Sequence, residues 1–354
     1  MLQAFFLLYI FSGHIEFSGQ LSGQIGAFEG ALDSPRLRAL YLPEWSFSQE
    51  LQNKLNMDVL VTLSSEANVW REDAWKTDLH SSLYRGWIRM GSERTEFRLG
   101  LQKINFGAAS ILRPLMWFDR VDPRDPQKLT EGVKGGLLRH YFQNNGTFWI
   151  WGLYGNHETK GWEMVPGKKN TPEWGGRFQT PVGQGEAAMT FHQRDISQSE
   201  LLEYQEERFG LDGKWDLGIG IWLESSWVRQ SKSAQANYTR MTTFGLDYTF
   251  SNGITAMLES MNTQILEHPT DWDSGFDVTV LSLSYAISFL DQITALLYFD
   301  WEQHQWFRFA NWTRTYDNFQ LITMAFWNDD FSAGTFSSNL YSGKGIQFQI
   351  VYNH

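Results

Sequence analysis

Basic side chains are concentrated between residues 85 and 139. This stretch holds eleven Lys and Arg against six Asp and Glu, a net charge of +5. Since the whole chain has a net charge of −11, the residues outside this stretch have a net charge of −16. Arginine is always charged and binds anions through several N–H donors, and rings of basic side chains select anions in pores. Either these arginines line a passage for anions, or they pair with neighbouring carboxylates and fill the interior of the fold.

Alternation along the chain decides which way these arginines point. In the segment 80–91, Arg85, Trp87 and Arg89 share one face, and the other face carries Tyr84, Gly86, Ile88 and Met90. In the segment 94–105, Arg94 and Arg98 oppose Phe97, Leu99 and Leu101. The basic face of each segment is therefore opposite an apolar face, as expected for a sheet with two different environments.

The residues 111–126 form the most distinctive stretch between these basic segments. Three prolines, Pro114, Pro123 and Pro126, exclude a central strand here. The run Leu115-Met-Trp-Phe118 is too apolar to stand in open solvent. We expect residues 106–130 to fold back into the protein, either as a constriction or as a packing plug.

The sequence gives little support for an enzyme. It contains no Gly-x-Ser-x-Gly and no His-Glu-x-x-His motif. His192 with Ser197 or Ser199 could imitate a hydrolase in a barrel wall, and Asp271, Asp273 and Asp277, or Asp329 and Asp330, could bind Ca²⁺. Clustered acids are more often solvated loop residues, so we predict no metal site. Since the catalytic motifs are missing, we also predict no enzymatic activity, no catalytic residues and no cofactor.

Composition and periodicity indicate the elements that position these residues. The chain has 354 residues, 17 Trp, no Cys and a net charge of −11. The missing cysteines exclude disulfides, thiolate metal sites and thiol catalysis, and the acidic balance disfavours nucleic-acid binding. No run reaches the ~18 apolar residues of a membrane-spanning helix. Polarity instead alternates with period two, as in 281–289 and 346–352.

These alternating segments are about 9–14 residues long, which suits strands that cross a membrane at a tilt. Abundant Trp and Tyr are typical of membrane–water boundaries. We therefore predict an all-β fold, a closed antiparallel transmembrane β-barrel, with a soluble all-β fold as the alternative. Seventeen segments can be placed, among them 291–304 and 314–328. Since bacterial barrels usually have even counts, we expect about 16 strands, with about 18 as the alternative.

The connectors divide the predicted barrel into two ends. Short turns such as 251–253 contrast with long connections at 106–130, 156–173 and 329–342. This asymmetry is typical of outer-membrane barrels with short periplasmic turns and long extracellular loops. Residues 1–13 include a short apolar run that fits a signal-peptide remnant, and 14–354 are expected to form a single barrel domain. The predicted location is therefore integral in the outer membrane of a Gram-negative cell.

Inside such a barrel the charged residues should face the lumen, because a charge on the lipid face costs about 2–4 kcal/mol at the midplane. The predicted pore-lining residues come from the two basic segments and from the 106–130 connection. They are Arg85, Arg89, Arg94, Arg98, Arg113, Asp119, Arg120, Asp122, Arg124 and Asp125.

Two stretches resemble a known pattern. Leu99-Gly-Leu-Gln-Lys-Ile-Asn-Phe-Gly107 followed by Arg113-Pro-Leu-Met-Trp-Phe-Asp119 resembles porin-like outer-membrane families, including the alginate-export type and related barrels of unassigned function. In those families a Gly-Arg-Gln strand precedes the aromatic loop, whereas this chain has Leu101 in place of the Arg. The resemblance covers about 20 residues and implies a barrel with a path for a solute or polymer.

Two functional hypotheses follow from this reading. The first is a passive or semi-selective channel for small polar or anionic solutes. The alternative is a non-enzymatic barrel subunit or scaffold of a larger outer-membrane complex, with the lumen plugged. The expected partners are outer-membrane lipid or lipopolysaccharide, a small polar solute and proteins at the long loops, but not nucleic acid.

Overall fold

A computed structural model describes most of the chain. The described residues are 13–28, 36–71, 74–121, 125, 127, 129–130, 132–199, 202–231, 238–271, 275–328 and 343–354. The predicted signal-peptide remnant lies outside them, except for residue 13.

Eighteen β-strands and one short 3-10 turn, η1 (Gln52–Lys54), account for the regular structure of this part of the chain. The strands are β1 (His14–Phe28), β2 (Arg36–Glu50), β3 (Asn56–Arg71), β4 (Trp75–Gly91), β5 (Thr95–Gln102), β6 (Val133–Tyr141), β7 (Thr147–Leu153), β8 (Glu173–Val182), β9 (Gly185–Ser199), β10 (Leu202–Asp216), β11 (Gly220–Gln230), β12 (Tyr238–Thr249), β13 (Ile254–Leu266), β14 (Phe276–Ala286), β15 (Asp291–Asp300), β16 (Gln305–Thr315), β17 (Phe319–Trp327) and β18 (Lys344–Asn353).

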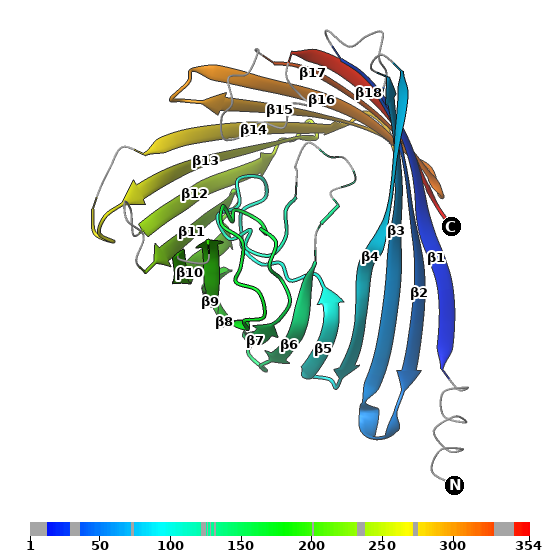
Figure 1. Cartoon of the computed structure of the whole chain (residues 1–354). Helices are drawn as coiled ribbons and strands as arrows, with labels where there is room; N and C mark the ends of the chain where they lie inside the picture. Colours follow the sequence, from blue (N-terminus) through cyan, green and yellow to red (C-terminus); the bar gives the residue numbers. More distant parts are fainter. Residues whose placement is uncertain are drawn as a thin grey trace.

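Each strand pairs antiparallel with its neighbours in sequence, and the last strand closes the sheet on the first (Figure 1). In this closing pair Gln20 lies opposite Asn353 and Phe28 opposite Gly345. The predicted closed antiparallel barrel is therefore confirmed. Its closure leaves the sheet without the two free edges that an open sheet would expose in lipid.

The preferred count of 16 strands is wrong, because the barrel has 18. The strand missing from the sequence reading is β16, which follows β15 after the turn 301–304. This turn contains no glycine, and His304 takes the left-handed conformation instead, with φ 53°. The sequence reading extended β15 through the turn because no Asn-Gly or Gly marked it.

The two ends of the barrel differ as the sequence predicts. At one end, strands join through short turns at 51–55, 92–94, 142–146, 183–184, 217–219, 250–253, 287–290 and 316–318. At the other end the connections include 103–132, 154–172 and 267–275. The first two of these turn inward and lie within the barrel (Figure 1).

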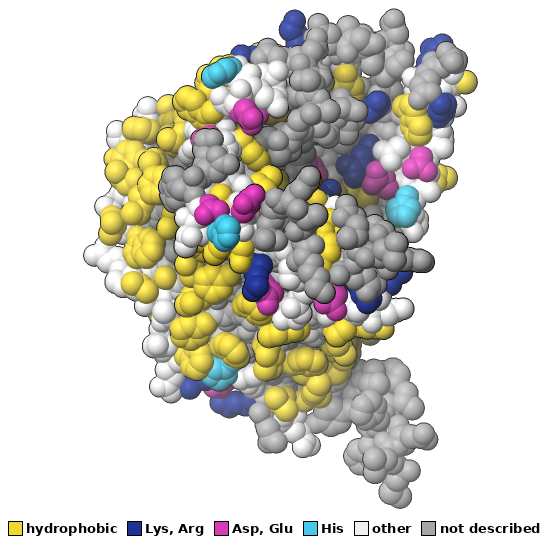
Figure 2. Space-filling view, turned by 60° about the vertical axis from the view of Figure 1, so that its left-hand side comes forward, with side chains coloured by type: hydrophobic (Ala, Val, Ile, Leu, Met, Phe, Trp, Pro, Cys, Tyr) yellow, Lys and Arg dark blue, Asp and Glu magenta, His cyan; other side chains and the backbone are white. Residues whose placement is uncertain are grey.

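Alternation along the strands separates an apolar outer surface from a polar lumen. On β18, Ile346, Phe348 and Ile350 are 40%, 49% and 54% exposed, whereas Gln347 and Gln349 are each 4% exposed. Figure 2 shows hydrophobic side chains spread over the outer wall. Such a surface favours contact with lipid, since removing apolar surface from water lowers the free energy by about 25 cal/mol per Å².

The wall has unequal height around its circumference. Strands β1 to β4 have 15 to 17 residues, but β5, β6 and β7 have 8, 9 and 7. As a result, β4 pairs with β3 over its whole length but with β5 only from Gly86 to Gly91. The long connection 103–132 leaves from this shorter side of the wall.

Within the described residues there is no helix of the length and apolarity needed to cross a membrane.

Candidate functional site in the barrel lumen

The connection between β5 and β6, residues 103–132, enters the lumen; we call it the inner loop. Its Ala109–Leu115 part lies against β11 to β13 on the far wall, and its Thr130 lies beside β4. Gln127 in the same loop donates to Gln20 on β1 through its side-chain amide, at 3.3 Å. The inner loop therefore contacts opposite walls and divides the lumen.

Glu224 on β11 binds the backbone of the inner loop at two positions. Its carboxylate accepts hydrogen bonds from the backbone N–H of Ala109 at 2.8 Å and of Leu115 at 2.7 Å. The close approach requires glycine at Gly107, where φ is +107° and a Cβ would lie 2.4 Å from the Glu224 Oε2. Glu224 is fully buried, so the polar backbone of the inner loop provides the hydrogen bonds that its carboxylate needs away from water.

Glu259 on β13 also binds the backbone of the inner loop. It accepts hydrogen bonds from the backbone N–H groups of Ser110, Ile111 and Leu112, at 2.7, 2.9 and 2.6 Å. The indole of Trp222 donates to the same carboxylate at 3.0 Å. Hydrogen bonds to an ionised acceptor are stronger than neutral ones, so this carboxylate fixes the backbone of the inner loop.

Apolar packing reinforces these polar contacts on both sides of the inner loop. Leu112 packs onto an apolar inner wall built by strands β13 to β17. This wall consists of Met261, Val278, Val280, Leu296, Tyr298, Phe307, Phe309, Met324 and Phe326. On the other side, Phe106, Leu115, Trp117 and Phe118 pack with Leu137, Trp151 and Leu153. The expectation that this segment avoids solvent agrees with these contacts.

The connection between β7 and β8, residues 154–172, packs against the inner loop; we call it the second inner loop. The Trp162 indole donates to the Arg113 carbonyl at 2.7 Å, and Arg120 donates to the Gly161 carbonyl at 3.2 Å. Gly161 has φ +51°, and a Cβ there would meet the Met116 carbonyl oxygen at 1.8 Å. The two loops thus form one packed unit within the barrel.

A buried charge network joins the second inner loop to β8, β9 and β10. Glu163 forms ion pairs with Arg194 at 2.8 Å and with Arg208 at 2.7 Å. Both arginines also pair with Glu206, at 2.7 and 2.6 Å. Each carboxylate has two guanidinium partners, as buried charges require.

His192 belongs to the neighbouring part of this network. Its Nδ1 accepts from the Trp151 indole at 3.2 Å, and its Nε2 lies 3.3 Å from the Glu173 carboxylate, which also pairs with Lys160 at 3.0 Å. Ser197 lies five residues further along β9, about 16 Å at the usual strand rise. The hydrolase arrangement considered for His192 and this serine therefore has no geometric support.

Three of the predicted pore-lining arginines lie on the wall formed by β4 and β5. Arg85 is buried and donates to the carbonyl and hydroxyl oxygens of Thr130, both at 2.7 Å. Arg89 forms an ion pair with Asp58 at 2.8 Å. Arg98 lies opposite Arg89, with its guanidinium 4.5 Å from the centre of the Trp87 ring. Arg85 and Arg89 therefore bind other groups of the protein, whereas Arg98 stacks on an aromatic ring.

Arg113 and Asp119, which the sequence predicts to line the pore, are both buried within the inner loop. Arg113 donates to Asn105 at 2.7 Å and forms an ion pair with Asp119 at 3.5 Å. Asp119 is only 1% exposed and accepts from the Asn105 amide at 2.8 Å. Burial lowers the pKa of nearby Lys103, because leaving water disfavours its charge, and Asp119 offsets part of this effect.

The other predicted site residues lie in several places. Arg94 is exposed in the short turn 92–94, beside Gln143, at the end of the barrel rather than within its middle. Arg120 is exposed and contacts the second inner loop, while Asp125 accepts from the backbone N–H of Gln127 at 3.0 Å. Asp122 and Arg124 lie outside the described residues.

Sequence reasoning missed the two carboxylates that hold the inner loop. Alternation does place Glu224 and Glu259 on the inner face, because each follows an outward-facing leucine, Leu223 on β11 and Leu258 on β13. Inward carboxylates are ordinary in a polar lumen, however, so alternation gave no reason to single these two out. Their partners are backbone N–H groups more than 100 residues away, which no local pattern reveals.

Cavities lie on the inner side of the barrel wall. One, of about 360 Å³, lies between the inner loop and the inner faces of β13 to β17, where Thr294, Asn311, Thr313 and Gln320 line it. The other, of about 410 Å³, lies against β1 to β4 and β18. Among the described residues, no group of three or more His, Cys, Asp or Glu is arranged to hold a metal ion.

Comparison with known proteins locates this fold among barrels that include porins. No protein-family model matches the sequence, and no curated protein does. OccK9 (OpdG) from Pseudomonas aeruginosa is similar in structure, with a TM-score of 0.64 and 11% identity over 98% of this chain and 99% of that one. OccAB4 from Acinetobacter baumannii gives 0.61 and 8%, over 97% and 98% of the two chains.

An anion-selective porin from Comamonas acidovorans is also similar, with a TM-score of 0.52 and 11% identity over 97% of this chain and 100% of that one. At these identities the likeness shows the fold, which is that of a porin-like barrel.

Proposed function

We propose that the protein is a porin-like channel, integral in the outer membrane of a Gram-negative cell, that passes small polar solutes and favours anions. The observation that carries the proposal is the lumen itself: a closed barrel with an apolar outer surface retains cavities on its inner side, one of them beside the inner loop. Lipid or lipopolysaccharide would cover the outer surface, with the short turns on the periplasmic side.

The preference for anions rests on the wall formed by β4 to β6. Arg98 has no carboxylate within 4 Å among the described residues. In contrast, Arg89 pairs with both Asp58 and Glu96, and Arg139 pairs with Glu96. A guanidinium without a carboxylate partner attracts anions from solution, and a low-dielectric wall strengthens that attraction. In this proposal the inner loop is the constriction, so solutes pass between it and the wall.

The test is the reversal potential of the purified protein in a planar bilayer under a KCl gradient. We expect a sign that corresponds to Cl⁻ preference, and a smaller potential for Arg98→Gln. Arg229→Gln serves as the control, because Arg229 is exposed and paired with Glu207 at 3.3 Å. A cation-selective wild-type channel would refute the proposed selectivity.

A second candidate is a plugged barrel that serves as a scaffold in a larger complex, with protein partners at the long loops. Its support is the core-like burial of the inner loop, where Leu112 and Trp117 are 1% and 2% exposed. It predicts no current from correctly folded protein and co-purification of a stoichiometric partner. A conducting protein without such a partner would exclude it.

A further inference from the structure

The cavity against β1 to β4 carries opposite charges at separate places, and this charge pattern identifies a class of solute. We infer that it binds short peptides of about two to four residues in extended form, with the peptide carboxylate at Arg36 and its ammonium group at Asp78. The inference rests on the proposed function, because it names a solute class for the same lumen.

The register of the strands sets the distance between the Cα atoms of the two charged residues. Arg38 lies opposite Asn68, and Asn68 opposite Asp78, so Asp78 is two strands away from β2. Arg36 lies two residues further along β2. At the usual spacings these offsets are about 10 Å across the strands and about 7 Å along them, or about 12 Å between the two Cα atoms.

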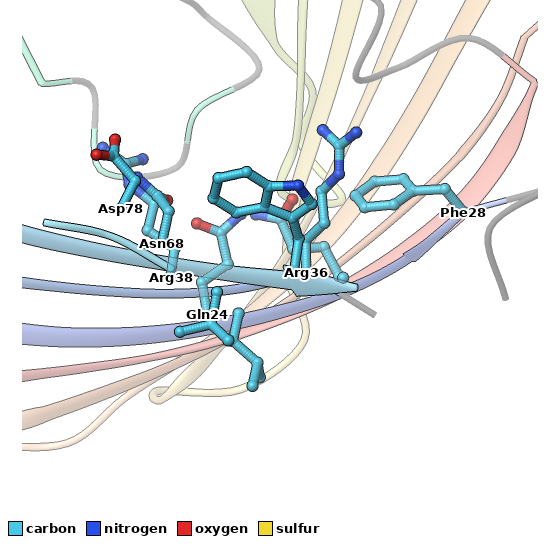
Figure 3. Close-up of a pocket in the computed structure, with 11 residues that line it drawn as sticks. Gln24, Phe28, Arg36, Arg38, Asn68 and Asp78 are labelled. Carbon is cyan, nitrogen blue, oxygen red and sulfur yellow. The ribbon is translucent and has the colours of Figure 1, made fainter. Parts of the chain in front are cut away.

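This separation suits a peptide better than a single amino acid. An extended chain spans at most about 3.3–3.6 Å per residue, so three residues span about 10 Å. The two ionic groups of one amino acid are too close together to reach both side chains. Figure 3 shows Asp78 grouped with Asn68 and Arg38 on one side of the cavity, and Arg36 at a separate position toward Phe28.

The charges available to a solute are Arg36 and Asp78, since the third ionic group in the cavity is already neutralised. Arg38 donates to both oxygens of Glu66, at 3.0 and 2.9 Å. The Asn68 amide donates to the same carboxylate at 2.8 Å. Among the described residues, neither Arg36 nor Asp78 has an oppositely charged group within 4 Å.

The remaining lining offers what a peptide backbone and small side chains need. Gln24 supplies carboxamide groups that can hydrogen-bond peptide N–H and C=O groups, and Phe28 and Trp70 supply apolar surface. Phe28 is held in place by its contact with Phe326, with ring centres 5.9 Å apart. A volume of about 410 Å³ lies within the range of ligand sites.

The test is calorimetric titration of the folded barrel in detergent at low salt, with trialanine, N-acetyl-trialanine and trialanine amide. We expect wild type to bind trialanine about fivefold or more tightly than either blocked peptide, because each blocked peptide loses one charge-assisted contact. This comparison needs no variant and so does not depend on a substitution that impairs folding.

Two variants assign each end of the peptide. In Asp78→Asn, trialanine and N-acetyl-trialanine should bind equally, while the amide should remain weaker. In Arg36→Gln, trialanine and its amide should bind equally, while the acetylated peptide should remain weaker. Arg229→Gln, which removes a positive charge from an exposed pair, should preserve both differences.

Equal affinity of wild type for all three peptides, or differences that persist in both variants, would overturn the inference. Absence of trialanine binding would overturn it as well. A barrel that conducts KCl but binds no peptide would disprove only this inference, whereas one that binds peptide without conducting would disprove only the proposed channel.

Discussion

At the scale of single residues, two carboxylates that accept hydrogen bonds from the backbone organise the lumen, rather than the arginines concentrated between residues 85 and 139. The arginine faces are predictable from alternation, and Arg85 and Arg89 do point inward. What each arginine contacts was not predictable, because its partners lie on other strands or in the inner loop. Glu224 and Glu259 show the same limit, since their role depends on where a distant loop lies.

Removal of the Glu259 carboxylate should release the inner loop. In Glu259→Ala, three backbone N–H groups lose their acceptor. The N–H of Leu112 is buried, and a buried unsatisfied donor costs about 1–3 kcal/mol. We expect amide hydrogen exchange at residues 110–112 to become at least about tenfold faster, because each 1.4 kcal/mol corresponds to a factor of ten. The measurement is hydrogen–deuterium exchange followed by mass spectrometry.

Glu207→Ala is the matched control, because it removes a carboxylate from β10 that is 36% exposed and forms an ion pair with exposed Arg229. Exposed pairs contribute little, so exchange at 110–112 should match wild type. Unchanged protection in Glu259→Ala would mean that apolar packing alone holds the inner loop.

At the scale of elements, strand type was predictable and strand number was not. Long alternating segments identify seventeen of the strands, but the turn between β15 and β16 uses His304 at φ 53° where a glycine would have marked it. The inward course of residues 106–130 was expected from the prolines and the run Leu115–Phe118. The contact of this loop with the second inner loop could not be predicted, because it depends on the Trp162 indole donating to the Arg113 carbonyl and on Arg120 donating to the Gly161 carbonyl.

The second inner loop should depend on Glu163. In Glu163→Gln, Arg194 and Arg208 lose one of their two carboxylate partners, and an incompletely paired buried charge typically costs about 3–5 kcal/mol. We expect a lower unfolding midpoint in urea, followed by tryptophan fluorescence in lipid vesicles. Exposed Glu207→Gln should leave the midpoint unchanged; equal midpoints for all three proteins would show that the network adds no stability.

At the scale of the whole molecule, period-two alternation was sufficient to predict a closed barrel, since it fixes which side chains face outward. The unequal height of the wall was not predictable, because the short strands β5 to β7 end where the chain turns inward to pack. The apolar inner wall of β13 to β17 was also unexpected, and it exists because the inner loop covers it.

The two faces of the wall should respond differently to charge. Leu258 on β13 points outward and is 39% exposed, whereas Thr294 on β15 lines a lumen cavity. A lysine on the lipid face costs about 2–4 kcal/mol near the midplane, so Leu258→Lys should lower the free energy of unfolding in lipid vesicles. Thr294→Lys should change it much less. Equal losses would contradict the assignment of the two faces.

The central claim is that water and small solutes pass through the lumen beside the packed inner loops. Single-channel recording of the full chain in a planar bilayer tests it directly, with folding and insertion verified on the same sample. The account predicts discrete current steps whose size rises in Glu259→Ala, because a released inner loop widens the path. Correctly inserted protein that gives no current steps, in wild type and in this variant, would contradict it.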